Sequence, residues 1–249
     1  QRAGGSLLCL VLAPAPISTR HIPTSAYYLY YWLLPFNLLL FGSVNKLESP
    51  NSRSSSLFPG LFIVEMAAGN RLLRVDAQGT LTHVAGLPTA GDTGDGGAAL
   101  SAQFNGPHNL AVLPNGNVLI SDTWNGRVRQ VDVTSARVST LPGYGVPAKQ
   151  GKASGPYCIA LDFTGTQLFI ADLRRVQALD LKTGKLRLIA GNGEKGVPVD
   201  GASATDAPLV DPRAAAADRR GNVYILERNG HALRVVTPDG KIRTVVNAS

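Results

Sequence analysis

The sequence repeats one short pattern four times between residues 60 and 249. Each copy holds a run of mostly apolar residues that ends in an acid, and the four acids lie 57, 50 and 55 residues apart. The four runs are Leu61–Glu65, Val118–Asp122, Leu168–Asp172 and Val223–Glu227. A repeat of this length restricts the chain to folds in which similar units stack, because one unit of about 50 residues cannot cover its own apolar surface.

Each copy has the pattern of four short strands. Two strand-like stretches follow every acid, and in three copies another stretch precedes the apolar run. The preceding stretches start at Gly106-Pro107, Gly155-Pro156 and Asp211-Pro212, and they lead into turns that contain Gly116, Gly165 and Gly221. Four strands joined by tight glycine turns form one blade of a β-propeller. We therefore predict an all-β fold, with Val118–Ile120, Leu168–Ile170 and Val223–Ile225 buried between blades.

The first copy is incomplete, because neither a Gly-Pro start nor a Pro-x-Gly turn precedes Phe62. The composition changes at the same place: only three of the 27 glycines lie before Gly60, whereas seven of the 16 aromatic residues lie between Tyr27 and Phe41. We expect residues 1–59 to be a leader outside the propeller and residues 60–249 to hold three complete blades and one partial blade.

The leader has two interpretations that the sequence leaves open. Ala26–Val44 contains no charge and is about long enough to cross a bilayer as a helix, although Pro35 and Asn37 interrupt it. An apolar run that begins at Leu7 loosely resembles a signal peptide. A genuine leader would place the protein outside the cytoplasm or on a membrane. Alternatively, the segment is truncated or non-native and precedes a Ser-rich linker at 45–59.

Charge and cysteine content disfavour several function classes. The chain carries a formal charge of +7, but residues 60–249 hold 20 basic and 16 acidic residues, which is a small surplus for a nucleic-acid-binding domain. The two cysteines, Cys9 and Cys158, form no CxxC pair, so the spacing of a zinc or redox site is missing.

The segment Asn105–Asp132, NGPHNLAVLPNGNVLISDTWNGRVRQVD, resembles the consensus of the NHL-repeat family. The Gly-rich segment that precedes it resembles the inter-blade loops of large bacterial NHL proteins. The resemblance extends more loosely over residues 61–247. It implies a β-propeller that usually closes with six blades, and this chain would then be an arc that lacks about two of them.

The four repeated acids are the first candidates for chemistry. Repetition predicts one acid per blade end, at Glu65, Asp122, Asp172 and Glu227. Such a ring could bind a metal, or each acid could fix the turn that follows it by accepting backbone N–H groups. We favour the structural role. Calcium is the cofactor to consider, but the loop at Asp92 and Asp95 has too few acids for a calcium site.

The second set of candidates would bind a ligand at the loops of one propeller face or at the mouth of the central channel. It comprises a histidine after a Gly-Pro start, a tryptophan in a turn, two arginines of the third strands and a second histidine: His108, Trp124, Arg127, Arg175 and His231.

We expect a non-enzymatic binding or scaffold module whose partner is a protein, a peptide or a small molecule. One alternative is a metal-dependent hydrolase or lyase, as in propellers of the lactonase or amidating-lyase type. The other is a sensor domain tethered to a membrane through Ala26–Val44.

Overall fold

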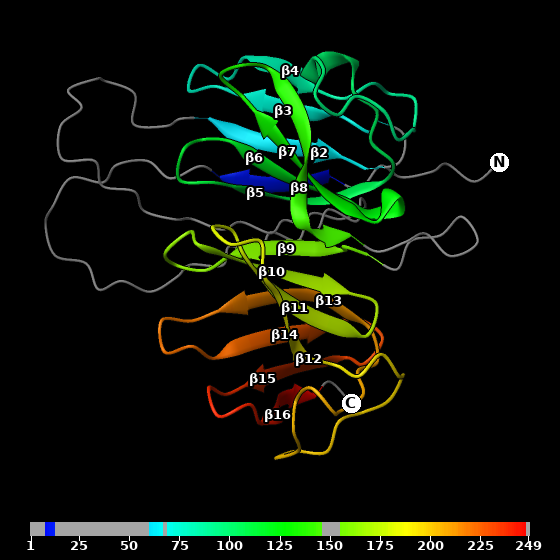
Figure 1. Ribbon diagram of the computed structural model, residues 1–249, viewed down its shortest axis with the longest axis vertical. Coiled ribbons are helices and arrows are strands. Elements are labelled where there is room, and N and C mark those ends of the chain that lie inside the picture. The colour runs from blue at the N-terminus through cyan, green and yellow to red at the C-terminus, as the bar shows by residue number, and fades with distance from the viewer. Residues whose placement is uncertain (1–7, 13–59, 67–68, 146–154, 248–249) are drawn as a thin grey trace, which may run out of the picture. The chain divides into compact units, whose positions relative to one another are not determined.

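The computed structural model describes residues 8–12, 60–66, 69–145 and 155–247, and these residues form an all-β fold (Figure 1). They contain sixteen strands in four antiparallel sheets of four strands each. The helical content of the described residues consists of two short 3-10 turns, η1 (Ala99–Ser101) and η2 (Thr123–Asn125). The predicted fold class is confirmed.

Three of the sheets follow the predicted order of strands. The second consists of β5 (Pro107–Val112), β6 (Val118–Asp122), β7 (Arg127–Asp132) and β8 (Arg137–Gly145). The third consists of β9 (Cys158–Leu161), β10 (Gln167–Asp172), β11 (Arg175–Asp180) and β12 (Leu186–Ala190). The fourth consists of β13 (Pro212–Ala217), β14 (Val223–Glu227), β15 (Ala232–Val236) and β16 (Ile242–Asn247). In each sheet, consecutive strands are neighbours.

The first sheet differs from the expected partial blade in one strand. It contains β2 (Leu61–Glu65), β3 (Leu72–Val75) and β4 (Leu81–Ala85), and its remaining edge is β1 (Leu8–Leu12). β1 pairs antiparallel with β2. The first strand of this blade, which the sequence indicated to be missing or replaced, is therefore replaced: an apolar strand from far upstream pairs with the edge of β2 without a Gly-Pro start. The limits of the leader as a domain stay a prediction.

The turn between the first two strands of a blade explains why the glycine recurs. Gly165 and Gly221 have φ values of +72° and +83°, a backbone region that favours glycine. The carboxylates of Asp162 and Asp218 accept backbone N–H groups across these turns, at 2.8 and 2.9 Å. Each turn is therefore specified by a short local sequence.

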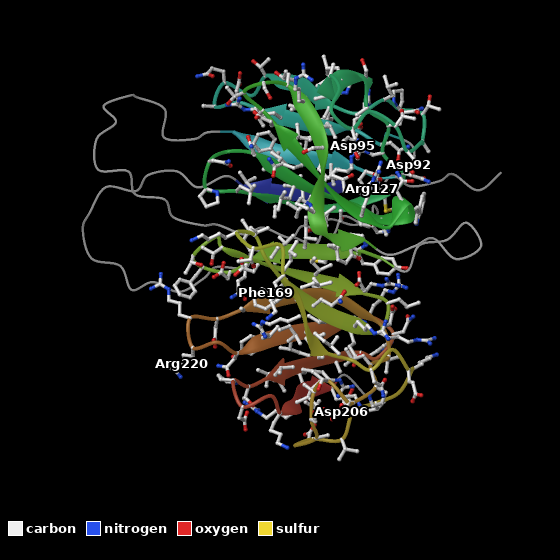
Figure 2. All side chains as sticks on the ribbon, viewed as in Figure 1. Asp92, Asp95, Arg127, Phe169, Asp206 and Arg220 are labelled. Carbon is white, nitrogen blue, oxygen red and sulfur yellow. The ribbon has the colours of Figure 1, made fainter. Side chains whose placement is uncertain are left out.

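The chain divides into two compact units, and each has its own core. The first contains the described residues up to 120 together with 130–139, and the second contains residues 121–129 together with the described residues from 140 onward. In the first, Phe62 and Val64 of β2 pack with Leu110 and Ile120 of the second sheet. In the second, the third and fourth sheets face each other across a core that contains the side chain of Phe169 (Figures 1 and 2).

The predicted burial of the central strands is confirmed for two of the three runs. All residues of Val118–Ile120 and Leu168–Ile170 are buried. In the third run Val223 and Ile225 are buried, but Tyr224 is half-exposed, as is Leu226 after it. β14 therefore alternates between a covered and a partly exposed face, which corrects the expectation that both of its faces are buried.

The apolar segment Ala26–Val44 lies outside the described residues. Within them, no helix has the length and apolar character needed to span a bilayer.

Candidate functional site

Three of the four repeated acids form ion pairs with arginines. Each arginine lies on the next strand of the blade or immediately before that strand. Glu65 accepts a hydrogen bond from Arg71 Nε at 2.6 Å, and Glu227 accepts one from Arg234 Nε at 2.6 Å. Because the acid ends one strand and the arginine lies near the start of the next, each ion pair ties the two strands together across their turn.

Asp122 makes the same type of contact with more partners. Arg127 Nε and Arg129 Nη1 each lie 3.6 Å from Asp122 Oδ2, and Asn125 donates to the same oxygen at 2.9 Å. The side chains of Asp122 and Arg129 are fully buried. One carboxylate at the end of β6 therefore holds two arginines of β7 and the turn between these two strands.

Asp172 is the exception among the four acids. Its carboxylate accepts a hydrogen bond from the hydroxyl of Tyr144, whereas Arg175 acts on it only as a nearby charge and donates instead to the carbonyl of Asn192 at 3.3 Å. Burial raises the pKa of Asp172 to about 7, against the opposing effects of the Tyr144 hydrogen bond and Arg175. Asp172 therefore carries only part of a charge at neutral pH.

The metal interpretation of the acids is not tested by these contacts and stays a prediction. Among the residues that the structure describes, no three metal-ligating side chains lie close enough together to hold an ion. Figure 2 shows Asp92 and Asp95 on the loop between β4 and β5, where both are exposed.

The predicted ligand-binding residues occupy different environments. His108 is half-buried on β5, and its Nδ1 lies 2.7 Å from the carbonyl oxygen of Gly106. Trp124 is 41% exposed on η2, and Arg175 is exposed at the start of β11. His231 is exposed in the turn between β14 and β15. Arg127 belongs to the Asp122 cluster (labelled in Figure 2), and ligand binding by all five stays a prediction.

Within the second unit, a row of contacts links the starts of inner strands to the turns that follow the repeated acids. The hydroxyl of Thr123 donates to the carbonyl of Pro156 at 2.6 Å, which places the η2 turn beside the segment that leads into β9. The guanidinium carbon of Arg213 lies 3.6 Å from the centre of the Tyr157 ring, a cation–π stack.

Asp211 lies beside these contacts and binds two arginines. Its Oδ1 lies 2.8 Å from Arg213 Nη2, and its Oδ2 lies 3.1 Å from both Nε and Nη2 of Arg228. The side chain of Arg228 is nevertheless 63% exposed. We call Trp124, Tyr157, Arg213 and Arg228 the arginine–aromatic row.

Sequence reasoning identified only Trp124 of this row. Tyr157 and Arg213 occupy the position that His108 occupies in the second sheet, immediately after Gly-Pro or Asp-Pro. The argument that selected His108 from the repeat applies equally to them. No comparable signal marks Arg228, since its role depends on Asp211, which lies on another segment of the blade.

The family model that matches this chain is the NHL repeat, over residues 104–131. Mouse (Mus musculus) Teneurin-1 is 33% identical over an alignment of 120 residues that covers 43% of this chain and 4% of Teneurin-1. The resemblance seen in the sequence is therefore confirmed, and the chain spans only a small part of this relative.

Solved β-propeller structures share the fold. An auxiliary nutrient binding protein from Bacteroides thetaiotaomicron matches 74% of this chain and 44% of its own, with a TM-score of 0.55 and 16% identity. A streptogramin B lyase matches 79% of this chain and 53% of its own, with a TM-score of 0.51 and 17% identity. The fold is thus shared with a binding protein and with an enzyme, so function has to be argued from the site.

Proposed function

Because this chain is built from NHL-type β-propeller blades, we propose that it is a non-enzymatic binding module whose contact surface includes the arginine–aromatic row. The observation that carries the proposal is that this row holds exposed aromatic and cationic side chains in defined positions. Trp124 is 41% exposed, and Arg228 is 63% exposed although Asp211 holds it by two nitrogens.

Residues of these types dominate the binding energy of protein interfaces. A tryptophan supplies a large rigid contact area, and an arginine supplies several hydrogen-bond donors together with a flat apolar surface. An arginine that is already held by an acid loses little side-chain entropy when a partner binds. The row therefore has both the chemistry and the order that a contact surface needs.

The contacts of the repeated acids disfavour the hydrolase or lyase alternative and so support the same proposal. A hydrolase or lyase needs carboxylates or histidines that converge on one reacting atom or one metal. Glu65, Asp122 and Glu227 bind arginines that lie on the adjacent strand or immediately before it, and Asp172 binds Tyr144. Under this proposal the acids hold the blades in shape and present the row.

The test is a selection for ligands followed by a matched pair of variants. Random peptides displayed on phage are selected on the purified chain, and the affinities of the selected peptides are measured by fluorescence anisotropy. Trp124→Ala should weaken binding by about tenfold or more, as expected for loss of a central aromatic contact. Phe163→Ala is the control, because Phe163 is 58% exposed in the turn between β9 and β10, at the other end of a blade.

Selected peptides that are insensitive to Trp124→Ala would place the contact surface elsewhere. Metal-dependent turnover of a lactone by the same preparation would support the enzyme alternative instead.

A further inference from the structure

The outer strand of each blade has an edge that no strand of its own sheet covers, and in two of the sheets a loop covers it instead. Beside β8, Val138 donates its N–H to the carbonyl of Gly97 at 3.2 Å and accepts the N–H of Gly96 at 2.7 Å. Beside β16, Ile242 makes the corresponding two bonds with the loop 201–202, at 3.0 and 2.8 Å. The backbone groups that these two edges would present to another chain are therefore already bonded.

The outer strand of the third sheet, β12 (labelled in Figure 1), has an edge that none of the described residues covers in this way. The N–H of Asp180 donates to the carbonyl of Lys185 at 3.0 Å, so the backbone of Lys185 faces β11. Because inward and outward backbone groups alternate along an antiparallel strand, Arg187 also faces β11, and Leu186 and Leu188 turn their backbone groups outward. Each of these leucines therefore offers one N–H donor and one carbonyl acceptor at the edge.

The side chains along this edge alternate between basic and apolar. Lys185, which immediately precedes β12, and Arg187 are exposed, whereas Leu186 is half-buried and Leu188 is 36% exposed. Successive side chains of a strand point to opposite faces, so the two cations lie on one face of the edge and the two leucines on the other. A strand that paired with β12 would place every second side chain beside a cation and the others beside a leucine.

A cavity of about 160 Å³ opens on the basic face of this edge, and six residues line it: Gln167, Ala178, Asp180, Thr183, Lys185 and Arg187. The carboxylate of Asp180 accepts the backbone N–H groups of Lys182 and Thr183, at 3.0 and 2.8 Å, and so belongs to its own turn. Three basic side chains, Lys182, Lys185 and Arg187, thus surround one carboxylate. The surplus of positive charge favours an acidic side chain on this face.

We propose that the edge of β12 binds an extended peptide segment in which acidic and apolar residues alternate, and that this segment joins the third sheet as a fifth, antiparallel strand. Its main chain pairs with Leu186 and Leu188, its carboxylates lie beside Lys185 and Arg187, and its apolar side chains lie beside the two leucines. The surface includes no residue of the arginine–aromatic row, so the inference does not depend on the binding function proposed for that row.

The experiment measures the fluorescence anisotropy of labelled hexapeptides with the full chain at low salt. The probe has the sequence Glu-Val-Glu-Val-Glu-Val, and the controls are Lys-Val-Lys-Val-Lys-Val and Glu-Glu-Glu-Val-Val-Val. The probe should bind about tenfold or more tightly than either control, because the first control places like charges beside Lys185 and Arg187 and the second lacks the alternation.

Two N-methylated forms of the probe test strand pairing without altering the protein. In an antiparallel pair, the valines opposite Leu186 and Leu188 point their N–H groups at β12, whereas the glutamates point theirs away from it. N-methylation of the central valine should therefore weaken binding by about tenfold, and N-methylation of the central glutamate should change it by less than about threefold.

A matched pair of protein variants tests the charge. Arg187→Gln should weaken binding of the probe by about fivefold, because it removes a cation beside the bound carboxylates. Arg243→Gln removes an exposed arginine from β16, the outer strand whose edge residues 201–202 cover, and should leave binding within about twofold. Melting curves of both variants verify that they fold.

The inference is overturned if the probe binds no better than its controls, if the two N-methylated forms bind equally well, or if the two arginine variants are equally impaired. Hydrogen exchange identifies any other occupant of the edge, because the amides of Leu186 and Leu188 should exchange rapidly in the free chain and slowly with the probe bound. Slow exchange in the free monomer would assign the edge to another segment of this chain, and protection that appears only on dimerisation would assign it to a second copy. Either result would overturn the proposal.

Discussion

Replacing Asp172 with asparagine should remove a large part of the pH dependence of this protein's stability near neutral pH. Asp172 is only 4% exposed, and burial raises its pKa from 3.8 to about 7. The folded state therefore holds a proton that the unfolded chain releases at much lower pH. The stability associated with this proton is fully present below about pH 4 and is lost progressively as the pH rises through about 7.

The magnitude follows from the difference between the two pKa values. The difference between a pKa near 4 and a pKa of about 7 corresponds to about 4 kcal/mol over the whole titration, and about 2–3 kcal/mol of that is lost between pH 5 and pH 7.5. The total stability of a domain is about 5–15 kcal/mol. Ionisation of this single carboxyl should therefore change the denaturation midpoint measurably.

The Asp172→Asn variant keeps the shape of the site and removes the ionisation, because the amide oxygen can still accept the hydrogen bond from Tyr144. The free energy of unfolding is measured by urea denaturation with circular dichroism at pH 5 and pH 7.5. We expect the stability of the variant, relative to the parent chain, to rise by about 2–3 kcal/mol between the two pH values.

Asp180→Asn is the matched control in the same sheet. Asp180 is half-exposed at the end of β11, and a hydrogen bond from the backbone of Thr183 is the main cause of its lowered pKa. Asp180 therefore stays ionised at both pH 5 and pH 7.5. If the Asp172 variant and the parent chain lose stability in parallel, Asp172 is ionised in the folded protein and the reasoning is refuted.

Three other perturbations test the fold. Ile170→Asp should unfold the second unit, because an unpaired charge would replace a fully buried side chain at a cost of several kcal/mol; an unchanged melting temperature would contradict the burial. Glu227→Gln should lower the free energy of unfolding, measured by urea denaturation, by about 3–5 kcal/mol, because the buried Arg234 loses its counter-charge. A loss no larger than that caused by the exposed control Glu194→Gln would contradict this role of Glu227. Deletion of residues 1–59 should lower the melting temperature, because β2 loses the hydrogen bonds of β1; an unaltered melting temperature would show that β1 contributes nothing.

The strands, the turns and the class of fold could be predicted from the sequence because each depends on residues that are close together in the chain. A central strand such as Leu168–Ile170 is apolar throughout, and a turn such as the one at Gly165 needs one residue with positive φ. Repetition made these local signals stronger, since the same pattern had to explain four segments. The repeated acids could be assigned to strand ends for the same reason.

The tertiary structure decided every feature that joins distant segments. β1 pairs with β2 although residues 13–60 separate them, and nothing in the run Leu8–Leu12 specifies that partner. Arg213 stacks on Tyr157 because the third and fourth sheets pack together, and Asp211 reaches Arg228 because β13 and β14 pair antiparallel. The raised pKa of Asp172 likewise depends on how completely the folded chain excludes water from it, and burial is a property of packing that no stretch of sequence carries alone.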